Sequence, residues 1–164
     1  MREIVFVSAG FVLGILCGSF AMYICWLVPK SKELRKRSNA QRYLDLTNQW
    51  LIVRQNGYSV SEFLAEKQMC RIAVYGMGLY GRHLIRELQH SDVVIEYGID
   101  CKKMKPYQGI CIRQPAEISG NVDAVINTVI WDHDNIERQL SVKVDCRIVN
   151  LEDIIFEIIP ADKN

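Results

Sequence analysis

Apolar residues occur along the chain first as one long uncharged run and then as shorter segments with regular spacing. The run covers residues 4–28, which is longer than the roughly 20 residues that a helix needs to cross about 30 Å of hydrocarbon. Tyr23 and Trp26 lie near its end, where aromatic rings favour the lipid headgroup layer, and Pro29 follows. This pattern predicts a transmembrane anchor over residues 1–29.

Two helices are predicted after the anchor. Residues 40–54 repeat apolar side chains at three- and four-residue intervals, which is typical of an amphipathic helix. Gly57 suits the position just beyond a helix end, and Ser59 to Glu62 has the spacing of a capping box that opens a second, short helix. We therefore expect residues 30–69 to form a basic juxtamembrane segment and a helical connector that packs against the rest of the chain.

The remaining part, residues 70–164, alternates short β-prone segments with helical ones. One helical pattern follows the first strand, and another closes the chain over residues 151–159. Between them, a third begins at Asp132 or Asp134, and residues 134–137 have the spacing of a capping box. This alternation favours an α/β fold with a parallel sheet, helices on both faces and the strand order 3-2-1-4-5. The five expected strands lie at residues 71–75, 93–99, 109–113, 122–130 and 146–150.

Length, charge and cysteine usage limit the possible functions. With 164 residues, a hydrophobic content of 49% and a net charge of +1, the chain suits one compact domain plus a membrane segment and excludes a second large domain. Such a charge gives no broad electrostatic footprint for nucleic acid, which is therefore not expected as a partner. The six cysteines form no C-x-x-C pair and have no histidine at metal spacing, so we expect no metal site and a reducing compartment.

Basic residues set the predicted orientation of the anchor. Five of them follow it closely, and only Arg2 precedes it. By the positive-inside rule, the chain spans the cell (inner) membrane once and its C-terminal domain is cytoplasmic. A cleaved signal peptide is the alternative, because residues 19–21 form a small-x-small site, but the apolar run continues past it. The five basic residues are Lys30, Lys32, Arg35, Lys36 and Arg37.

Within the apolar run, three glycines are spaced by four residues. Gly10, Gly14 and Gly18 would form one smooth stripe on a helix, where a second helix can approach closely. The lipid bilayer is therefore one expected partner, and the stripe predicts either a homo-oligomer or pairing with a different membrane protein. Chance spacing is the alternative, because glycine is frequent in membrane helices.

A glycine-rich segment joins the first strand of the α/β part to the helix that follows. Gly76-Met77-Gly78-Leu79-Tyr80-Gly81 comes directly after strand 71–75, and a helical pattern follows at once. Asp100 ends the second strand about twenty residues beyond the last glycine. A strand, glycine loop, helix, strand and acid in this order match the β-α-β fingerprint of dinucleotide-binding proteins.

Each glycine of the loop has its own physical reason. Gly76 permits the tight turn out of the strand, Gly78 lets the backbone approach a pyrophosphate, and Gly81 lets the helix pack against the strand. The helix N-terminus then holds the phosphates with its N–H groups and dipole, so no basic side chain is required. The predicted cofactor-binding residues are Gly76, Met77, Gly78, Leu79, Tyr80, Gly81, Asp100 and Thr128.

Asp100 bears on which nucleotide is bound. Its carboxylate can accept hydrogen bonds from both hydroxyls of an adenosine ribose and would repel a 2′-phosphate, which favours NAD over NADP. Lysines within residues 102–105 weaken this preference. Ligands of a parallel sheet lie at the carboxyl ends of its strands, so Asn127, Thr128 and Trp131 are expected to border the same crevice as the glycine loop.

These segments together resemble a small Rossmann-like module that is associated with bacterial surface-polysaccharide and glycosyltransferase proteins. The resemblance covers roughly residues 40–159 and is carried by Trp50-Leu51, Gly57, RIAVYGMGLYGRHLIREL, EYGID, VDAVINTVIWDHD and VNLEDIIFEI. In that setting, the module accompanies enzymes that act on nucleotide sugars or lipid-linked sugars. The resemblance therefore implies a role in surface glycan biosynthesis and makes a nucleotide sugar the alternative ligand to NAD.

No catalytic residue is predicted. The Tyr-x-x-x-Lys pair of short-chain dehydrogenases is absent, and neither His83 nor His90 has a carboxylate or nucleophile partner that the sequence reveals. His133 is interpreted as a helix-terminus residue rather than a general base. The first hypothesis is a membrane-tethered accessory or regulatory nucleotide-binding module. Its alternatives are an NAD-dependent nucleotide-sugar-modifying enzyme that a partner completes, and a structural module whose glycine loop binds nothing.

Overall fold

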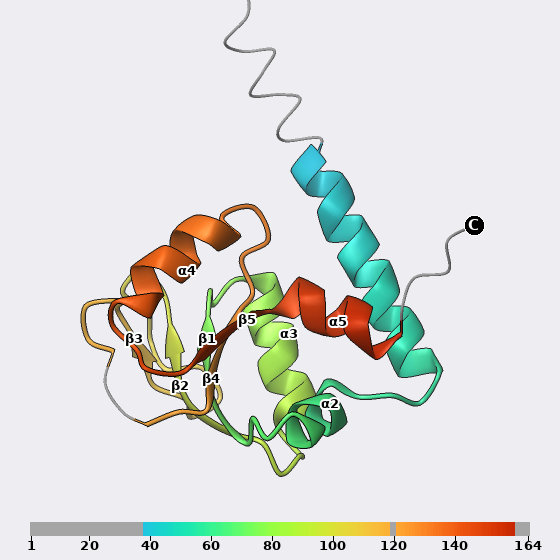
Figure 1. The fold of residues 1–164 in the computed structure, drawn as a ribbon, viewed down its shortest axis with the longest axis horizontal. Helices are drawn as coiled ribbons and strands as arrows, with labels where there is room; N and C mark the ends of the chain where they lie inside the picture. Colours follow the sequence, from blue (N-terminus) through green and yellow to red (C-terminus); the bar gives the residue numbers. More distant parts are fainter. Residues whose placement is uncertain (1–37, 119–120, 160–164) are drawn as a thin grey trace, which may run out of the picture. The chain divides into compact units, whose positions relative to one another are not determined.

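The computed structural model describes residues 38–118 and 121–159 of the chain (Figure 1). The chain divides into two compact units, Met1–Gln41 and Arg42–Asn164. The predicted anchor, the basic cluster behind it and the stripe of Gly10, Gly14 and Gly18 lie outside the described residues. Within the part of the chain that is described, no helix is long and apolar enough to cross a membrane.

The second unit is built on a parallel sheet of five strands. Its order is β3-β2-β1-β4-β5, so the predicted sheet and its strand order are confirmed. The carboxyl ends of β1 and β4 lie side by side where the chain reverses its direction of travel across the sheet, which is where such sheets bind ligands. The strands are β1 (Arg71–Tyr75), β2 (Val94–Ile99), β3 (Ile112–Arg113), β4 (Ala124–Asn127) and β5 (Arg147–Asn150).

Helices cover both faces of the sheet, as predicted (Figure 1). Because side chains alternate along a strand, Ile72 and Val74 of β1 enter one apolar cluster with α3 and α5, whereas Ala73 and Tyr75 enter another with α4. Burial on both faces explains why the strands read as nearly continuous apolar runs. The helices are α2 (Val60–Glu66), α3 (Leu79–Leu88), α4 (His133–Ser141) and α5 (Leu151–Ile158).

A further helix over residues 38–55, here called the connector helix, packs into the core of the second unit from Arg42 onward. Leu46, Trp50 and Val53 are buried in the same cluster as α3 and α5. The Trp50 indole N–H donates to the Glu87 carboxylate of α3 at 2.6 Å. The amphipathic helix and its packing against the following domain are therefore confirmed, and the compact unit begins well before residue 70.

The local signals around α2 form as expected. Gly57 has a φ of +83° just beyond the connector helix, a conformation that favours glycine. The Ser59 hydroxyl accepts a hydrogen bond from the Glu62 backbone N–H at 3.2 Å, which makes Ser59 the N-cap of α2. The sequence signals thus correctly place the end of the connector helix and the start of α2.

Two elements differ from the prediction for local reasons. Strand β3 has only two residues instead of the segment 109–113, because Gln108 and Gly109 adopt positive φ and make a tight turn. The box expected from Asp134 to Glu137 does not start α4, because the helix has already begun at His133 with Asp132 as its N-cap. The Asp132 carboxylate accepts from the Asn135 side chain at 3.1 Å instead of capping the backbone.

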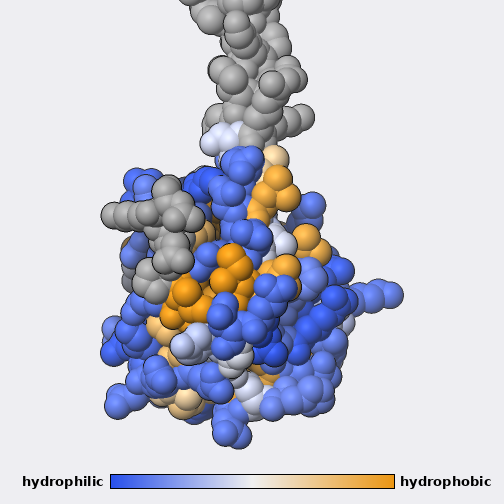
Figure 2. All heavy atoms as spheres, turned by 90° about the vertical axis from the view of Figure 1, so that its right-hand side faces the viewer, coloured by the Kyte–Doolittle hydropathy of each residue, from blue (hydrophilic) through white to orange (hydrophobic). Residues whose placement is uncertain are grey.

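The surface of the second unit is mostly hydrophilic on the face that Figure 2 shows, and apolar atoms gather there in one band. Leu44 and Leu51 of the connector helix are more than half exposed. Single exposed apolar side chains of this kind are common on protein surfaces. The connector helix therefore buries one side against α3 and α5 and carries both apolar and hydrophilic residues on the other.

Candidate functional site

The glycine loop leaves the carboxyl end of β1 in a conformation that requires glycine at its first position. Gly76 has a φ of +90°, and its N–H donates to the Ile99 carbonyl at the end of β2 at 2.8 Å. A Cβ atom at Gly76 would lie 2.7 Å from a Val129 methyl carbon and 2.9 Å from the Thr128 hydroxyl oxygen. Both the backbone and the available space therefore exclude a side chain here.

The other two glycines of the loop differ sharply from each other. A Cβ atom at Gly81 would lie 2.1 Å from the Gly76 carbonyl oxygen, so Gly81 lets α3 pack directly against the loop. At Gly78, the N-cap of α3, a Cβ atom would meet nothing within 4 Å, and no side chain caps the helix, among the residues that the structure describes. The first N–H groups of a helix have no partner within it. An open space in front of free N–H groups is an arrangement that can bind an anion.

Asp100 lies beside this loop, at the end of β2. One carboxylate oxygen accepts from the Met77 N–H at 2.9 Å, and the other accepts from the Lys102 N–H at 2.8 Å. A carboxylate offers about four acceptor positions, so hydrogen bonds to a ligand remain possible. Asp100 therefore holds the loop in place and also presents a negative charge next to it.

Three other predicted residues, two of the loop and one beside it, have side chains that serve the fold. Met77 is buried, with its sulfur packed against Gly98 of β2. The Tyr80 hydroxyl donates to the Tyr43 carbonyl of the connector helix at 2.7 Å. The Thr128 hydroxyl lies 2.9 Å from the Tyr75 carbonyl oxygen and 2.7 Å from that of Gly76. The backbone N–H groups of Met77 and Thr128 are also engaged, with Asp100 and with the Tyr75 carbonyl, so of the three residues Tyr80 alone offers its backbone N–H, in the first turn of α3.

A crevice of about 260 Å³ opens beside the loop, at the ends of β1, β2 and β4. Burial raises the pKa of the Tyr75 hydroxyl in its wall, and the hydrogen bond with Cys101 raises it further, so this hydroxyl stays protonated. Of the predicted residues, the structure brings Gly76 and Asp100 into this wall. Its lining residues are Tyr75, Gly76, Asp100, Cys101, Val129, Asp132, Asn135, Ile136 and Gln139.

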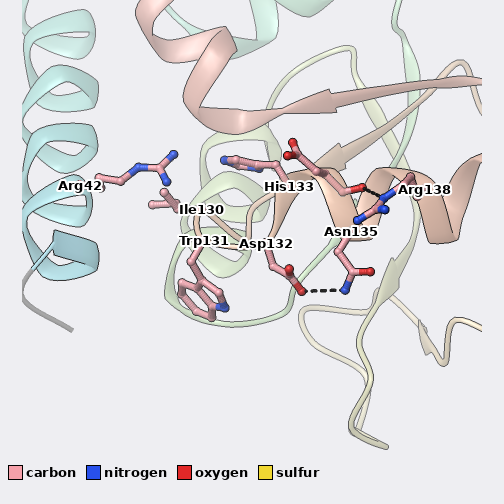
Figure 3. Close-up of a pocket in the computed structure, with 8 residues that line it drawn as sticks. Arg42, Ile130, Trp131, Asp132, His133, Asn135 and Arg138 are labelled. Carbon is pink, nitrogen blue, oxygen red and sulfur yellow. Dashed lines mark hydrogen bonds between the residues drawn. The ribbon is translucent and has the colours of Figure 1, made fainter. Parts of the chain in front are cut away.

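A polar network that the sequence did not predict lies beside the crevice. The His133 Nδ1 atom lies 3.1 Å from the Asn127 amide nitrogen, and Nε2 lies 3.2 Å from the Glu152 carboxylate. Arg42 of the connector helix donates to the same carboxylate oxygen at 2.6 Å and points toward His133 (Figure 3). Arg42 and Glu152 are 110 residues apart, so no local pattern could have indicated this contact.

The network engages both ring nitrogens of His133. The Asn127 amide oxygen accepts from the Val129 N–H at 3.0 Å, which turns the amide nitrogen toward Nδ1. The neutral tautomer that fits this network accepts from the amide at Nδ1 and donates to Glu152 from Nε2. Both ring nitrogens are used within the protein. His133 is the first residue of α4, and this arrangement suits a structural role at the helix end.

Residues 38–118 and 121–159 contain no group of three or more His, Cys, Asp or Glu side chains that could hold a metal ion. The four cysteines that the structure describes, Cys70, Cys101, Cys111 and Cys146, are free thiols. The chemistry of the site is therefore that of backbone N–H groups, Asp100 and the crevice wall.

The fold and the site together define a class: a small α/β unit with a parallel sheet and, at the end of its central strand, a glycine loop that leads into a helix whose N-terminus has no side-chain cap within the described residues. Comparisons of the chain with protein-family models, with curated proteins and with solved structures find no match.

Proposed function

We propose that residues 42–159 form a Rossmann-type module that binds NAD or a nucleotide sugar. The observation that carries this proposal is the open, uncapped N-terminus of α3 at Gly78, with the Asp100 carboxylate beside the same loop. A loop that served only as a turn would need Gly76 and Gly81 for steric reasons but would have no steric need for glycine at Gly78.

In this proposal, each part of the nucleotide has a place. The pyrophosphate lies over Gly78, where the first N–H groups of α3 and the helix dipole stabilise its charge. The ribose hydroxyls donate to the free acceptor positions of Asp100. The base and the remaining groups lie along the crevice between the ends of β1, β2 and β4.

The proposed role is that of an accessory or regulatory module in surface glycan biosynthesis. The resemblance of residues 40–159 to modules of glycan-synthesis proteins supports the biological setting. The commitment of both His133 ring nitrogens to Asn127 and Glu152 supports a binding role, because a general base needs a free nitrogen to accept a proton. In this proposal, the apolar run at residues 4–28 tethers the module to the cell membrane, on its cytoplasmic side.

The nucleotide site is tested with Asp100→Ala in the full chain purified in detergent. We expect affinity for NAD, or for UDP-glucose, to fall at least about tenfold, since a hydrogen bond to a charged group contributes about 1.5–3 kcal/mol. Calorimetry of the wild type and the variant measures this, and the melting temperature shows whether the domain stays folded.

Two further variants control for the structural bonds of Asp100. Asp100→Asn keeps an acceptor for the Met77 N–H and should lose less affinity than the alanine variant. Glu96→Ala removes an acid of the same strand whose carboxylate pairs with Arg71, and it should leave binding unchanged. A folded wild type that binds neither ligand at millimolar concentration would show that the loop is only structural.

The membrane tether gives a separate prediction, for which the exposed thiols of Cys70, Cys101 and Cys111 serve as reporters. A membrane-impermeant maleimide should leave them unlabelled in intact cells and should label them once the membrane is opened. A variant with serine at these three positions provides the background signal. Labelling in intact cells, or a mature chain that begins near residue 22, would contradict the cytoplasmic orientation of an uncleaved anchor.

A further inference from the structure

A second and larger hollow adjoins the crevice. It has a volume of about 430 Å³ and shares Asp132 and Asn135 with the crevice wall. The shared residues belong to the start of α4, so the two hollows follow one another along the carboxyl ends of the strands. Its lining residues are Arg42, Ile130, Trp131, Asp132, His133, Asp134, Asn135 and Arg138 (Figure 3).

One side of this hollow combines an exposed aromatic ring with hydrogen-bonding groups. In Figure 3, the side chains of Trp131, Asp132 and Asn135 extend to the same side. Trp131 is 50% exposed although its ring packs against Tyr43, at 5.5 Å between centroids and 65° between planes. Tyr43 in turn stacks on Tyr80, which holds the aromatic group in place. The ring is therefore both fixed and accessible.

The polar groups of the hollow match a ligand that has many hydroxyls. Asp132 accepts from the Asn135 amide nitrogen and retains acceptor positions for hydroxyl donors, whereas the Asn135 amide oxygen accepts from Gln139 and keeps one further acceptor position. Two arginines and two aspartates line the hollow, so their formal charges balance, which favours an uncharged group. The oxidised nicotinamide ring of NAD is a cation and has few hydrogen-bonding groups. A neutral sugar has an apolar face for an aromatic ring and hydroxyls for a carboxylate and an amide.

We propose that the second hollow holds the sugar of a nucleoside diphosphate sugar, with Trp131 as its platform and Asp132 and Asn135 as its hydrogen-bonding partners. This inference rests on the nucleotide site proposed above. The diphosphate lies at Gly78, and the sugar that it carries extends past the shared residues Asp132 and Asn135 into the hollow. The ligand class is thus a nucleotide sugar rather than NAD.

The test compares each nucleoside diphosphate with its sugar conjugate on the full chain in detergent. The probes are UDP and UDP-glucose, ADP and ADP-glucose, and GDP and GDP-mannose, with NAD as the competing class. In the wild type, we expect one conjugate to bind at least about tenfold tighter than its diphosphate, which is the usual size of a pocket contact. Trp131→Ala should remove that advantage and leave the affinity for the diphosphate unchanged. Trp131→Phe keeps an aromatic platform and should retain most of it.

The possible outcomes separate this inference from the nucleotide site itself. Equal affinities for diphosphate and conjugate in the wild type would overturn the sugar site, and so would a Trp131→Ala variant that weakens both ligands equally. Tighter binding of NAD than of every conjugate would also overturn it, although the nucleotide site would stand. Failure of a folded wild type to bind any probe would instead refute the proposed nucleotide site.

Discussion

Replacement of Gly81 by alanine is expected to destabilise the α/β unit by about 3 kcal/mol or more, because the new methyl group has no room. Its carbon would lie 2.1 Å from the Gly76 carbonyl oxygen, which is a backbone atom that cannot rotate away. Gly76 is itself held by a hydrogen bond to Ile99 and by its positive φ. The helix or the loop must therefore shift. Denaturation of the full chain, followed by circular dichroism, measures the loss.

Gly78→Ala is the matched control, because Gly78 belongs to the same loop but has open space around its Cβ position. We expect its free energy of unfolding to stay within about 1 kcal/mol of the wild type, because the poorer helix cap and the reduced entropy of the unfolded chain have opposite effects. Equal losses in the two variants would mean that the close approach of α3 to the loop is not what makes Gly81 necessary.

Gly78→Val is expected to abolish nucleotide binding, with a loss of affinity of more than about a hundredfold, while the domain stays folded. The branched side chain would fill the space in front of the α3 N-terminus, where the pyrophosphate must approach the backbone. Nothing in the described structure lies within 4 Å of the Cβ position, so the protein itself can accommodate the change. Calorimetry with UDP-glucose and NAD measures binding, and the melting temperature reports on the fold.

Leu79→Ala is the control for the neighbouring position. Leu79 is 67% exposed and contributes its N–H, not its side chain, to the first turn of α3, so its truncation should leave binding intact. Binding that persists in Gly78→Val would place the phosphates away from the glycine loop. Binding that is lost in Leu79→Ala would show that side chains, rather than the backbone, hold the ligand.

Much of this unit follows from its sequence because the signals are local or periodic. The run 71–75, the glycines after it and the amphipathic pattern that follows specify a strand, a turn and a helix within about twenty residues. Strands buried on both faces then favour a parallel sheet, and short connections restrict its order, which the structure confirms. The steric needs of Gly76 and Gly81 were also predicted, since both arise within the same turn.

The sequence left the start of α4 open between two residues and made one strand too long. Asp132 and Asp134 are both good helix caps by residue type, and the sequence alone could not choose between them. The fold starts α4 at His133 and engages Asp132 with the Asn135 side chain. Likewise, a turn at Gln108 and Gly109 removed the first residues of the strand expected at 109–113.

The sequence by itself determined the alternation of strands and helices, the glycine loop and the acid at the end of β2, because each depends on residues that are close along the chain. Only the tertiary structure decided what those residues touch. The Thr128 hydroxyl donates to the backbone just beyond β1, and the Asp100 carboxylate accepts from the Met77 N–H. Arg42 donates to Glu152, which is 110 residues away in the sequence. The tertiary structure also left Gly78 open and placed Trp131 in the second hollow instead of the crevice wall that the sequence predicted for it. Contacts of this kind depend on how distant elements pack, and pairwise hydrogen bonds carry no periodic signal that a sequence could display.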